Sequence, residues 1–424
     1  MNDMSKKDEL LPLLGYYMRL SGIILLATVS VRCSKVEQTG RLTVKQAGEE
    51  ARFGTPISKS AGSAIIGTEN QKTFYFSNKG GEWKEETVFE PKNSSARFGS
   101  AVSCYKEHVL IGSLGDPRNQ RSGEIVFYSD PPQTKGSQWE MVSHSPSIDK
   151  LAENVYVQET CLTESFAFIG VIVSQEVDHR PVSRGAVFVY QRKGEGWTYL
   201  MQLSPDDKGK KSDNFGRSIS ASGDHLLVGA SGDEEDGAVY FFHYDGVKWE
   251  RSAKIDTEDE PDNEGNLDYD RFGASVSIGE DYAVIGAPGD NFGAGSAYIF
   301  KKRGQEWKKH GKLIPDDQQA LEISNGQPSG TTPFTESGFG SAVSIHEDYA
   351  LVGSPAHGKK DQGRAYLFHF NGKEWAQQEV IAPNEEREGA YFGSAVQLGD
   401  TYCLIGAPRE AEKQGAVYSF TYQQ

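Results

Sequence analysis

A short sequence unit recurs seven times along the chain, and this repetition limits the fold more than any other feature. Six copies begin with Phe-Gly, at residues 53, 98, 215, 272, 339 and 392. A degraded copy, Val155-Tyr156, fills the long gap after the second, whereas Phe292-Gly293 is out of phase and is excluded. Each unit continues into an apolar run that contains Gly, such as SAIIGT at 63–68 or YAVIGA at 282–287.

Within a unit the apolar runs are short and are bounded by Gly, Asp or Asn, which is typical of β-strands joined by turns. The period is roughly 45 to 68 residues, with four runs in each period. Such a period predicts propeller blades, each of which buries its faces only against its neighbours. We therefore predict an all-β fold, a seven-bladed β-propeller of four-stranded antiparallel blades, over residues 34–424. The blades should start near residues 53, 98, 155, 215, 272, 339 and 392.

The seventh unit is incomplete, because the chain reaches GAVYSFTYQQ after its third strand. Residues 40–46, which begin Gly40-Arg41-Leu42, have the apolar spacing of the fourth strands MQLSPDD and GKLIPDD. We predict that this segment pairs with the last strand and closes the ring, which removes an exposed sheet edge.

The repeated residues have a structural explanation. Gly in each second strand allows neighbouring blades to approach where a side chain would collide. Phe at the start of the first strand and Trp at the start of the fourth offer large apolar surfaces for burial between sheets. Six units carry the tryptophan, as Trp83, Trp139, Trp197, Trp249, Trp307 and Trp375. We interpret these residues as packing groups and not as a carbohydrate-binding platform.

The repeated FGxSVSI, LVGAPGD, GAVYIF and GxxW segments resemble the FG-GAP repeat, the blade motif of the integrin alpha-subunit propeller. The likeness covers residues 53–424, and it is greater to bacterial secreted FG-GAP proteins, whose units have the same GD turn and Trp. It implies a seven-bladed propeller with a role in adhesion or assembly, and it implies no particular ligand. Integrin-type blades commonly hold calcium in a DxDxDG loop between the first two strands. Here that connection is GED, SGD or HED, which is too short to surround a calcium ion.

Other loops are acidic, and they supply the candidate binding residues. The segment from Asp256 to Asp270 holds eight carboxylates and no basic residue. The binding candidates are Asp256, Asp259, Asp262, Asp268, Asp270 and Asp290. Calcium is a weaker hypothesis, with Asp233, Asp236, Asp262 and Asp268 as its candidate ligands. The plain alternative is that these loops are simply solvated, and no cofactor is expected.

The first 33 residues are interpreted as a signal or anchor segment. Met18-Arg19 precedes a mostly apolar run of twelve residues, LSGIILLATVSV, which is typical of a secretory signal and short for a membrane span. Translation could begin at Met1 or at Met18. Cys33 resembles the lipid-modified cysteine of bacterial lipoproteins, although Arg32 replaces the small residue expected before it. We expect a secreted or envelope location, with membrane attachment only through this segment, and an uncleaved anchor or a plain secreted form as alternatives.

Charge and cysteine content narrow the choice of partners. The formal net charge of −16 argues against nucleic acid as a partner, because nucleic-acid binding requires a basic surface. Four cysteines are too few for a disulfide scaffold. Cys104 and Cys161 occupy the apolar position that Ile278 and Ile345 hold in other units, so we predict core thiols. We expect a monomer.

Loop lengths predict where function lies. Connections between first and second strands, and between third and fourth, look short, whereas those between second and third strands and between blades are long and varied. Because strands alternate in direction, both long classes meet on one face, where binding is usually built. We expect a non-catalytic module that binds a protein or glycan there. The alternative is a hydrolytic propeller with paired carboxylates in these loops, although no GxSxG, HExxH or His/Cys cluster is present.

Overall fold

The computed structural model describes residues 36–44, 50–69, 71–91, 97–115, 122–129, 139–144, 155–177, 180–205, 213–233, 236–256, 270–291, 293–316, 337–358 and 360–422. Contacts divide the chain into Met1–Cys33 and Ser34–Gln424, and every described residue belongs to the second unit. The predicted signal segment, with Cys33, therefore lies outside the described residues. No helix in the described part of the chain has the length and hydropathy that a membrane crossing requires.

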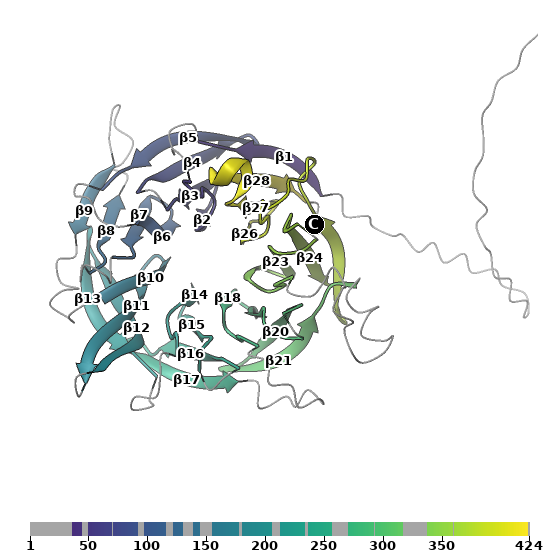
Figure 1. Ribbon diagram of the computed structural model, residues 1–424. Coiled ribbons are helices and arrows are strands. Elements are labelled where there is room, and N and C mark those ends of the chain that lie inside the picture. The colour runs from purple at the N-terminus through teal and green to yellow at the C-terminus, as the bar shows by residue number, and fades with distance from the viewer. Residues whose placement is uncertain are drawn as a thin grey trace, which may run out of the picture. The chain divides into compact units, whose positions relative to one another are not determined.

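The described strands form seven four-stranded antiparallel sheets, arranged as the blades of a propeller (Figure 1). Blade 1 consists of β2 (Ile57–Ser60), β3 (Ser63–Gly67), β4 (Thr73–Lys79) and β5 (Glu82–Phe89). Blade 2 consists of β6 (Phe98–Tyr105), β7 (His108–Ser113), β8 (Ile125–Ser129) and β9 (Glu140–His144). Blade 3 consists of β10 (Val155–Leu162), β11 (Phe166–Val177), β12 (Arg180–Lys193) and β13 (Gly196–Leu203). Blade 4 consists of β14 (Ser218–Ser222), β15 (His225–Ala230), β16 (Ala238–Tyr244) and β17 (Trp249–Asp256). Blade 5 consists of β18 (Ser275–Ile278), β19 (Tyr282–Ala287), β20 (Ser296–Arg303) and β21 (Glu306–Leu313). Blade 6 consists of β22 (Ala342–His346), β23 (Tyr349–Ser354), β24 (Arg364–Phe370) and β25 (Trp375–Ile381). The predicted fold and the seven units are thus confirmed.

Blade 7 is completed by the N-terminal strand, as predicted. It consists of β26 (Ala395–Leu398), β27 (Tyr402–Ala407), β28 (Ala416–Thr421) and β1 (Glu37–Leu42). The strand differs in extent from the predicted 40–46, because pairing starts at Glu37 opposite Thr421 and ends at Leu42 opposite Val417. Its first residues alternate between exposed and half-buried positions, and Leu42 is the first buried one. Backbone pairing therefore extends beyond the apolar residues that indicated the strand.

Glycine-to-glycine contacts join the blades around the axis. A Cβ on Gly286, in the second strand of blade 5, would lie 2.0 Å from the carbonyl oxygen of Gly340 in blade 6. The last blade meets the first in the same way, because a Cβ on Gly406 would lie 2.1 Å from the oxygen of Gly54. The degraded third unit lacks this pair, and there a Cβ on Gly112 would meet Val157. The predicted reason for the second-strand glycine is confirmed.

Aromatic residues fill the spaces between blades. Each tryptophan packs on the preceding blade: for example, the rings of Trp307 and Phe241 are stacked with centroids 5.4 Å apart. In blade 7, which has no tryptophan, Tyr422 packs on Tyr349 of blade 6 with centroids 5.3 Å apart. Tyr422 is buried and its hydroxyl donates to the Gly399 carbonyl. Tyr422, at the register position that Phe370 holds in blade 6, therefore keeps an aromatic contact between blades where the tryptophan is missing.

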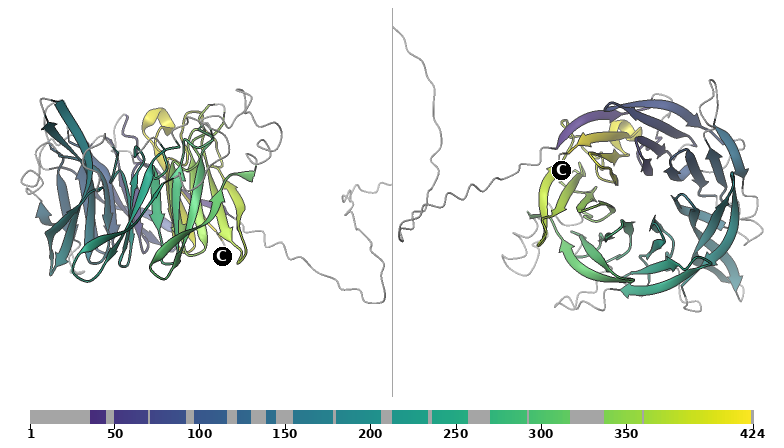
Figure 2. Two further views of the ribbon diagram at one scale, coloured as in Figure 1. Left: turned by 90° about the horizontal axis from the view of Figure 1, so that it is seen from below. Right: turned by 180° about the vertical axis from the view of Figure 1, so that it is seen from behind.

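The two faces of the disc carry different connections (Figure 2). Two or three residues join the first strand to the second in all seven blades, and hairpins of two to four residues join the third to the fourth in five of the six continuous blades. We call this the short-hairpin face. Blade 2 is an exception to the prediction, since residues 130–139 separate β8 from β9. A second unpredicted feature is the long β11–β12 ribbon, paired as far as Val177 and Arg180, which projects from the opposite face.

Candidate functional site

The opposite face, here called the long-loop face, gathers the connections from second to third strands and from one blade to the next. In blades 4 to 7 the second-to-third connection has a common build. The glycine before each third strand donates its N–H to the carbonyl of one loop residue: Gly237 to Asp233, Gly295 to Asp290, Gly363 to His357 and Gly415 to Glu410. These four loop residues occupy what we call the loop-acid position. Three of them, Asp233, Asp290 and Glu410, are acids. All three acids are buried.

Each buried acid is held by a tyrosine and a cation from its own blade. Asp233 Oδ2 accepts a hydrogen bond from the Tyr240 hydroxyl at 2.7 Å and lies 3.0 Å from Lys254 Nζ. Tyr240 and Lys254 are direct cross-strand partners on β16 and β17. The loop Asp therefore meets a Tyr-Lys pair that the sheet register has already placed side by side.

Blade 5 repeats this arrangement with Asp290, Tyr298 and Lys312. The carboxylate accepts from the Tyr298 hydroxyl at 2.8 Å and lies 2.9 Å from Lys312 Nζ. Burial alone would raise the pKa of Asp290, but Lys312 and the hydrogen bond from Tyr298 outweigh burial and hold this pKa below its usual value. The group is therefore an ionised carboxylate with its oxygens engaged inside the protein. In blade 6 the acid is replaced by His357, whose Nδ1 lies 3.3 Å from the Tyr366 hydroxyl.

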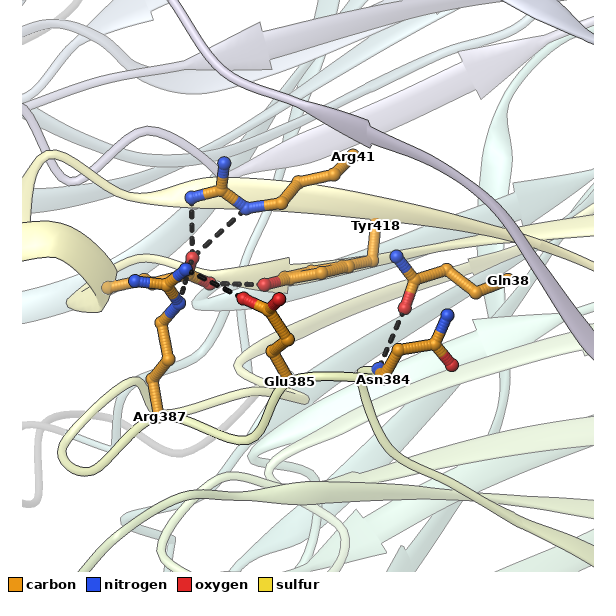
Figure 3. A network of polar contacts seen from close by, with 7 residues as sticks. Gln38, Arg41, Asn384, Glu385, Arg387 and Tyr418 are labelled. Atoms are coloured by element: carbon orange, nitrogen blue, oxygen red, sulfur yellow. Dashed lines mark hydrogen bonds and ion pairs between the residues drawn. The ribbon is translucent and has the colours of Figure 1, made fainter.

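Blade 7 contains the largest version of the arrangement (Figure 3). Glu410 replaces Asp, and Arg41 from β1 replaces Lys, with its Nε 3.0 Å from Glu410 Oε1. The Tyr418 hydroxyl donates to Oε2 at 2.7 Å, and Arg387 from the preceding loop places its Nε 3.2 Å from Oε1. Burial and the neighbouring Glu410 raise the pKa of Tyr418 to about 12, so the hydroxyl stays a donor. Glu410 thus joins β1, β28 and the loop between blades 6 and 7.

The turn that carries Glu410 is strained. Element α3 (Glu410–Lys413) has left-handed backbone at Ala411 (φ 50°), Glu412 (φ 58°) and Lys413 (φ 69°). Left-handed conformation costs roughly 1–2 kcal/mol for each residue other than glycine, so surrounding contacts must hold it. Buried Glu410, bound to Arg41 and Tyr418, supplies such contacts.

The structure places the predicted binding and calcium residues in different surroundings. Asp290 and Asp233 are the buried acids described above, Asp256 ends β17, and Asp270 is half-buried before blade 5. The carbonyl of Asp236 accepts from the Phe272 N–H, which ties blade 4 to blade 5. Asp259, Asp262 and Asp268 lie outside the described residues. Within the described ranges, no three His, Cys, Asp or Glu side chains are grouped closely enough to hold a metal ion.

Sequence reasoning did not single out the acid-tyrosine-cation contacts, although a signal for them exists. Tyr stands three residues after the glycine in GAVY, GSAY, GRAY and GAVY of blades 4 to 7. The cations occur in matching fourth-strand segments, AKI with Lys254, GKL with Lys312 and GRL with Arg41. Polar loop acids look solvated in a sequence, and only the cross-strand register shows that Tyr and a cation lie beneath them.

A half-buried aromatic group stands on the long-loop face between blades 6 and 7. The Tyr391 hydroxyl donates to Asp361 Oδ2 at 3.0 Å, and the Arg409 guanidinium lies 4.1 Å from the centre of the Tyr391 ring. Tyr391 has φ 55°, which is unusual for a bulky residue. Its burial and Asp361 raise its pKa. We call Asp361, Tyr391 and Arg409 the corner patch, in which two side chains hold an aromatic ring at the surface.

One carboxyl group lies apart from both loop face and hairpins. Glu159 is on β10, the innermost strand of blade 3, where it pairs with Gly170. Burial raises the pKa of Glu159 to about 7, and its Oε1 accepts a hydrogen bond from the Thr160 N–H at 2.9 Å.

Histidines occur on the short-hairpin face in repeated pairs with aspartate. His243 Nε2 lies 3.0 Å from Asp224 Oδ2, and His369 Nε2 lies 3.1 Å from Asp348 Oδ2. The two pairs stand at the same position of the repeat, in blades 4 and 6. Each pair ties a first hairpin to a third strand.

Comparison with known families identifies the repeat. The FG-GAP repeat family matches residues 197–242, 264–300, 335–368 and 375–420, which fall in the last four blades and the strand that precedes them. The chain carries four FG-GAP repeats. Blades 1 to 3 of this FG-GAP propeller lie before the matched residues except for β13, yet they have the same four strands. No curated protein matches the sequence.

The repeat fits the integrin alpha-like propeller that the sequence predicts. FG-GAP propellers serve in general as protein-binding scaffolds. The long-loop face of this FG-GAP protein, with its buried acids beneath and the corner patch above, is therefore its candidate functional site.

Proposed function

We propose that this FG-GAP propeller is an exported, envelope-attached module that binds a protein through its long-loop face and catalyses no reaction. The proposal rests on the different roles of two groups of residues on that face, the loop acids and the corner patch. The loop acids are buried and paired, so they stiffen the loops, while the corner patch presents a half-buried aromatic ring and an exposed arginine. Arg and Tyr are enriched among residues that dominate protein interfaces.

Preorganisation supports binding by the corner patch. The Tyr391 backbone N–H donates to the Asp361 carbonyl at 3.1 Å, and the Arg409 N–H donates to the Ala390 carbonyl at 3.3 Å. Because both backbone and side chains are fixed before a partner arrives, little conformational entropy is lost on binding. A glycan ligand is the competing choice, and the experiment below distinguishes the two.

Export is inferred from the signal-like residues 18–33, and the topology suits attachment through them. β1 runs as a fourth strand, so Glu37 lies at the short-hairpin end of blade 7 and Leu42 at the long-loop end. The chain thus enters the ring on the face opposite the proposed binding surface. Labelling with a radioactive fatty acid should mark the full chain and should be lost in Cys33→Ser. Labelling of both the unmodified protein and the Cys33→Ser variant would contradict envelope attachment through Cys33. Labelling of neither protein, together with retention in the cytoplasm, would also contradict it.

Site-specific photo-crosslinking tests the binding face. A crosslinking amino acid replaces Glu388, exposed on the loop beside Tyr391, or Val247, which is 75% exposed on the short-hairpin face. In intact cells we expect one discrete protein adduct from position 388 and none from 247. Adding Tyr391→Asn and Arg409→Ala should reduce that adduct about tenfold, and Asn tolerates the left-handed backbone at 391. Equal adducts from both faces, an adduct unaffected by the two substitutions, or a carbohydrate adduct would contradict the proposal.

A further inference from the structure

We infer that the outer edge of β28, together with Glu410, is a strand-acceptor site that recognises β1 through Arg41 and can receive that strand from a second copy of the chain. The inference is independent of the proposed function. It rests on the backbone match between β1 and the other fourth strands, on the contacts of Arg41, and on how β1 is connected.

The backbone match includes a shared irregularity. In each continuous blade the fourth strand has one extra residue, and the register shifts, for example, between Phe241 and Phe242 in blade 4 and between Ile299 and Phe300 in blade 5. β1 has this bulge at the same place, because Gln38 pairs with Phe420 and Gly40 with Ser419. Thr39 is the extra residue. The edge of β28 therefore accepts a strand with a defined bulge, which a generic extended peptide does not supply.

Arg41 fixes the register. It pairs with Tyr418 as Lys254 pairs with Tyr240 and Lys312 with Tyr298, and it meets the buried Glu410 from that position. A shift of one residue would turn Arg41 to the other face of the sheet and bring Gly40 or Leu42 beside the carboxylate. Glu410 would then lose its partner from β1, and a buried charge without its partner is strongly destabilising. The acceptor thus selects a strand with a cation at this one position.

Groups outside β1 complete the recognition. The Asn384 N–H donates to Gln38 Oε1 at 2.9 Å, and Trp83 Nε1 of blade 1 donates to Ser419 Oγ at 3.1 Å. Leu42 is buried in one cluster with Ala51 and Phe53. All these partners lie in the body of the ring. A β1 strand from another molecule would find the same groups in place.

The connection of β1 makes such an exchange feasible. Every other fourth strand follows its third strand in the chain, whereas β1 and β28 stand at opposite ends of it. β1 can therefore leave its blade without opening a hairpin. Residues 43–52 connect it to blade 1, and exchange of an identical terminal element is a low-cost route to dimers.

A disulfide trap tests exchange in the full chain. The Thr39 and Ser419 side-chain oxygens lie 3.1 Å apart, and Ser419 is buried. Two differently tagged copies, one with Thr39→Cys and one with Ser419→Cys, are mixed under mild oxidation. We expect a disulfide-linked heterodimer that carries both tags. The double variant Thr39→Cys, Ser419→Cys should instead form a closed monomer.

Arg41 is then tested with a matched control. Adding Arg41→Met to the Thr39→Cys copy should lower the heterodimer yield about tenfold when unmodified strand competes. Adding Lys312→Met to that copy should leave the yield unchanged, because Lys312 makes the corresponding contact in blade 5. Recognition through Arg41 would be overturned if Arg41→Met and Lys312→Met lowered the yield equally, or if neither substitution lowered it.

A second measurement does not depend on a disulfide. A protease site placed within residues 45–49 allows the folded chain to be cut, after which a fluorescent peptide of residues 34–46 is added. Uptake of this peptide, with at least tenfold weaker uptake of the Arg41→Met peptide, would support the inference. Absence of both heterodimer and peptide uptake would overturn it.

Discussion

The acids of the second-to-third loops show how a charged side chain can act as a structural part. Asp233, Asp290 and Glu410 each accept a tyrosine hydroxyl and contact one cation from the fourth strand. The carboxylate therefore connects a loop to two strands, and its charge is balanced inside the blade. A buried carboxylate stripped of its cation costs more free energy than the pair contributes.

The pH dependence of stability should report on Asp290. Its folded pKa lies below the ordinary value of 3.8, so its stabilisation is complete above that value and is lost as pH falls through the folded pKa. We expect Asp290→Asn to lower the free energy of unfolding by about 1–3 kcal/mol at pH 7. This difference should shrink below about pH 4, as measured by urea denaturation from pH 2 to 7.

The control for that experiment is Glu374→Gln, in an exposed hairpin. Its stability should follow the unmodified protein at every pH. A deficit in Asp290→Asn that stays constant down to pH 2 would show that the ionised form of Asp290 is not what stabilises the blade.

The three described cysteines should be unreactive in the folded protein. Cys104, Cys161 and Cys403 are free thiols, and burial raises their pKa values to about 11, 12 and 12. Alkylation needs the thiolate and access to it. Brief treatment with iodoacetamide at pH 8 should leave all three unmodified by mass spectrometry and should modify all three in denaturant. Rapid modification of Cys104 without denaturant would contradict its place in the core.

Among the elements, the second strands depend on glycine most strongly. Seen from Gly286, the carbonyl of Gly340 stands where a Cβ would need to be, and Gly353 and Gly406 face the same obstacle in their blades. The opposing atom is backbone, which belongs to a rigid turn at the start of the next blade. The spacing between blades is therefore set by backbone contact as well as by side-chain packing.

A pair of alanine substitutions tests this contact. Gly286→Ala should lower the free energy of unfolding by about 3 kcal/mol, because its Cβ would lie 2.0 Å from the Gly340 oxygen. Gly311→Ala, on the fourth strand of the same blade, has Trp375 Cδ1 at 3.7 Å as its nearest neighbour and should change stability by less than about 1 kcal/mol. Equal effects in denaturant titrations would show that glycine acts there through backbone entropy alone.

The elements were largely predictable from sequence, and the exceptions have physical causes. Repeated Phe-Gly doublets, second-strand glycines and tryptophans place the blades, because each of these residues serves the same contact in nearly every blade. The start of β1 was missed by three residues, since Glu37 and Gln38 pair through backbone atoms that any sequence provides. The β11–β12 ribbon was missed because its extra length repeats in no other unit. Loop-face contacts such as Arg409 on Tyr391 depend on loop geometry that no repeat encodes.

At the scale of the whole molecule, the ring is joined twice at one place. β1 pairs with β28, and the last blade also meets the first through Gly406 and Gly54. Trp83 of blade 1 packs on Tyr402 of blade 7 with ring centroids 5.4 Å apart, as the other tryptophans pack on the blades before them. The junction between blades 7 and 1 is thus built like the others, although the third and fourth strands of blade 7 come from opposite ends of the propeller sequence.

Tyr422 should matter as much as an interblade tryptophan. We expect Tyr422→Ala to lower the free energy of unfolding by about 3–5 kcal/mol, the usual effect of truncating a buried large aromatic residue. Trp307→Ala, which removes an aromatic contact between blades 4 and 5, should cost a similar amount. Thermal unfolding of both variants measures the effect. If the stability of Tyr422→Ala alone changed little, the interface between blades 6 and 7 would tolerate a gap.

The pairing of Glu37 with Thr421 has a further consequence. Because the first and last strands of the propeller are neighbours in one sheet, the order of the strands in the gene could change without changing the fold. A circularly permuted gene, with a short linker after residue 424 leading into residue 36 and new ends opened between Gly246 and Val247, should give the same propeller. In that permutant the linker joins β28 to β1 as a hairpin, and the new chain ends lie between the third and fourth strands of blade 4.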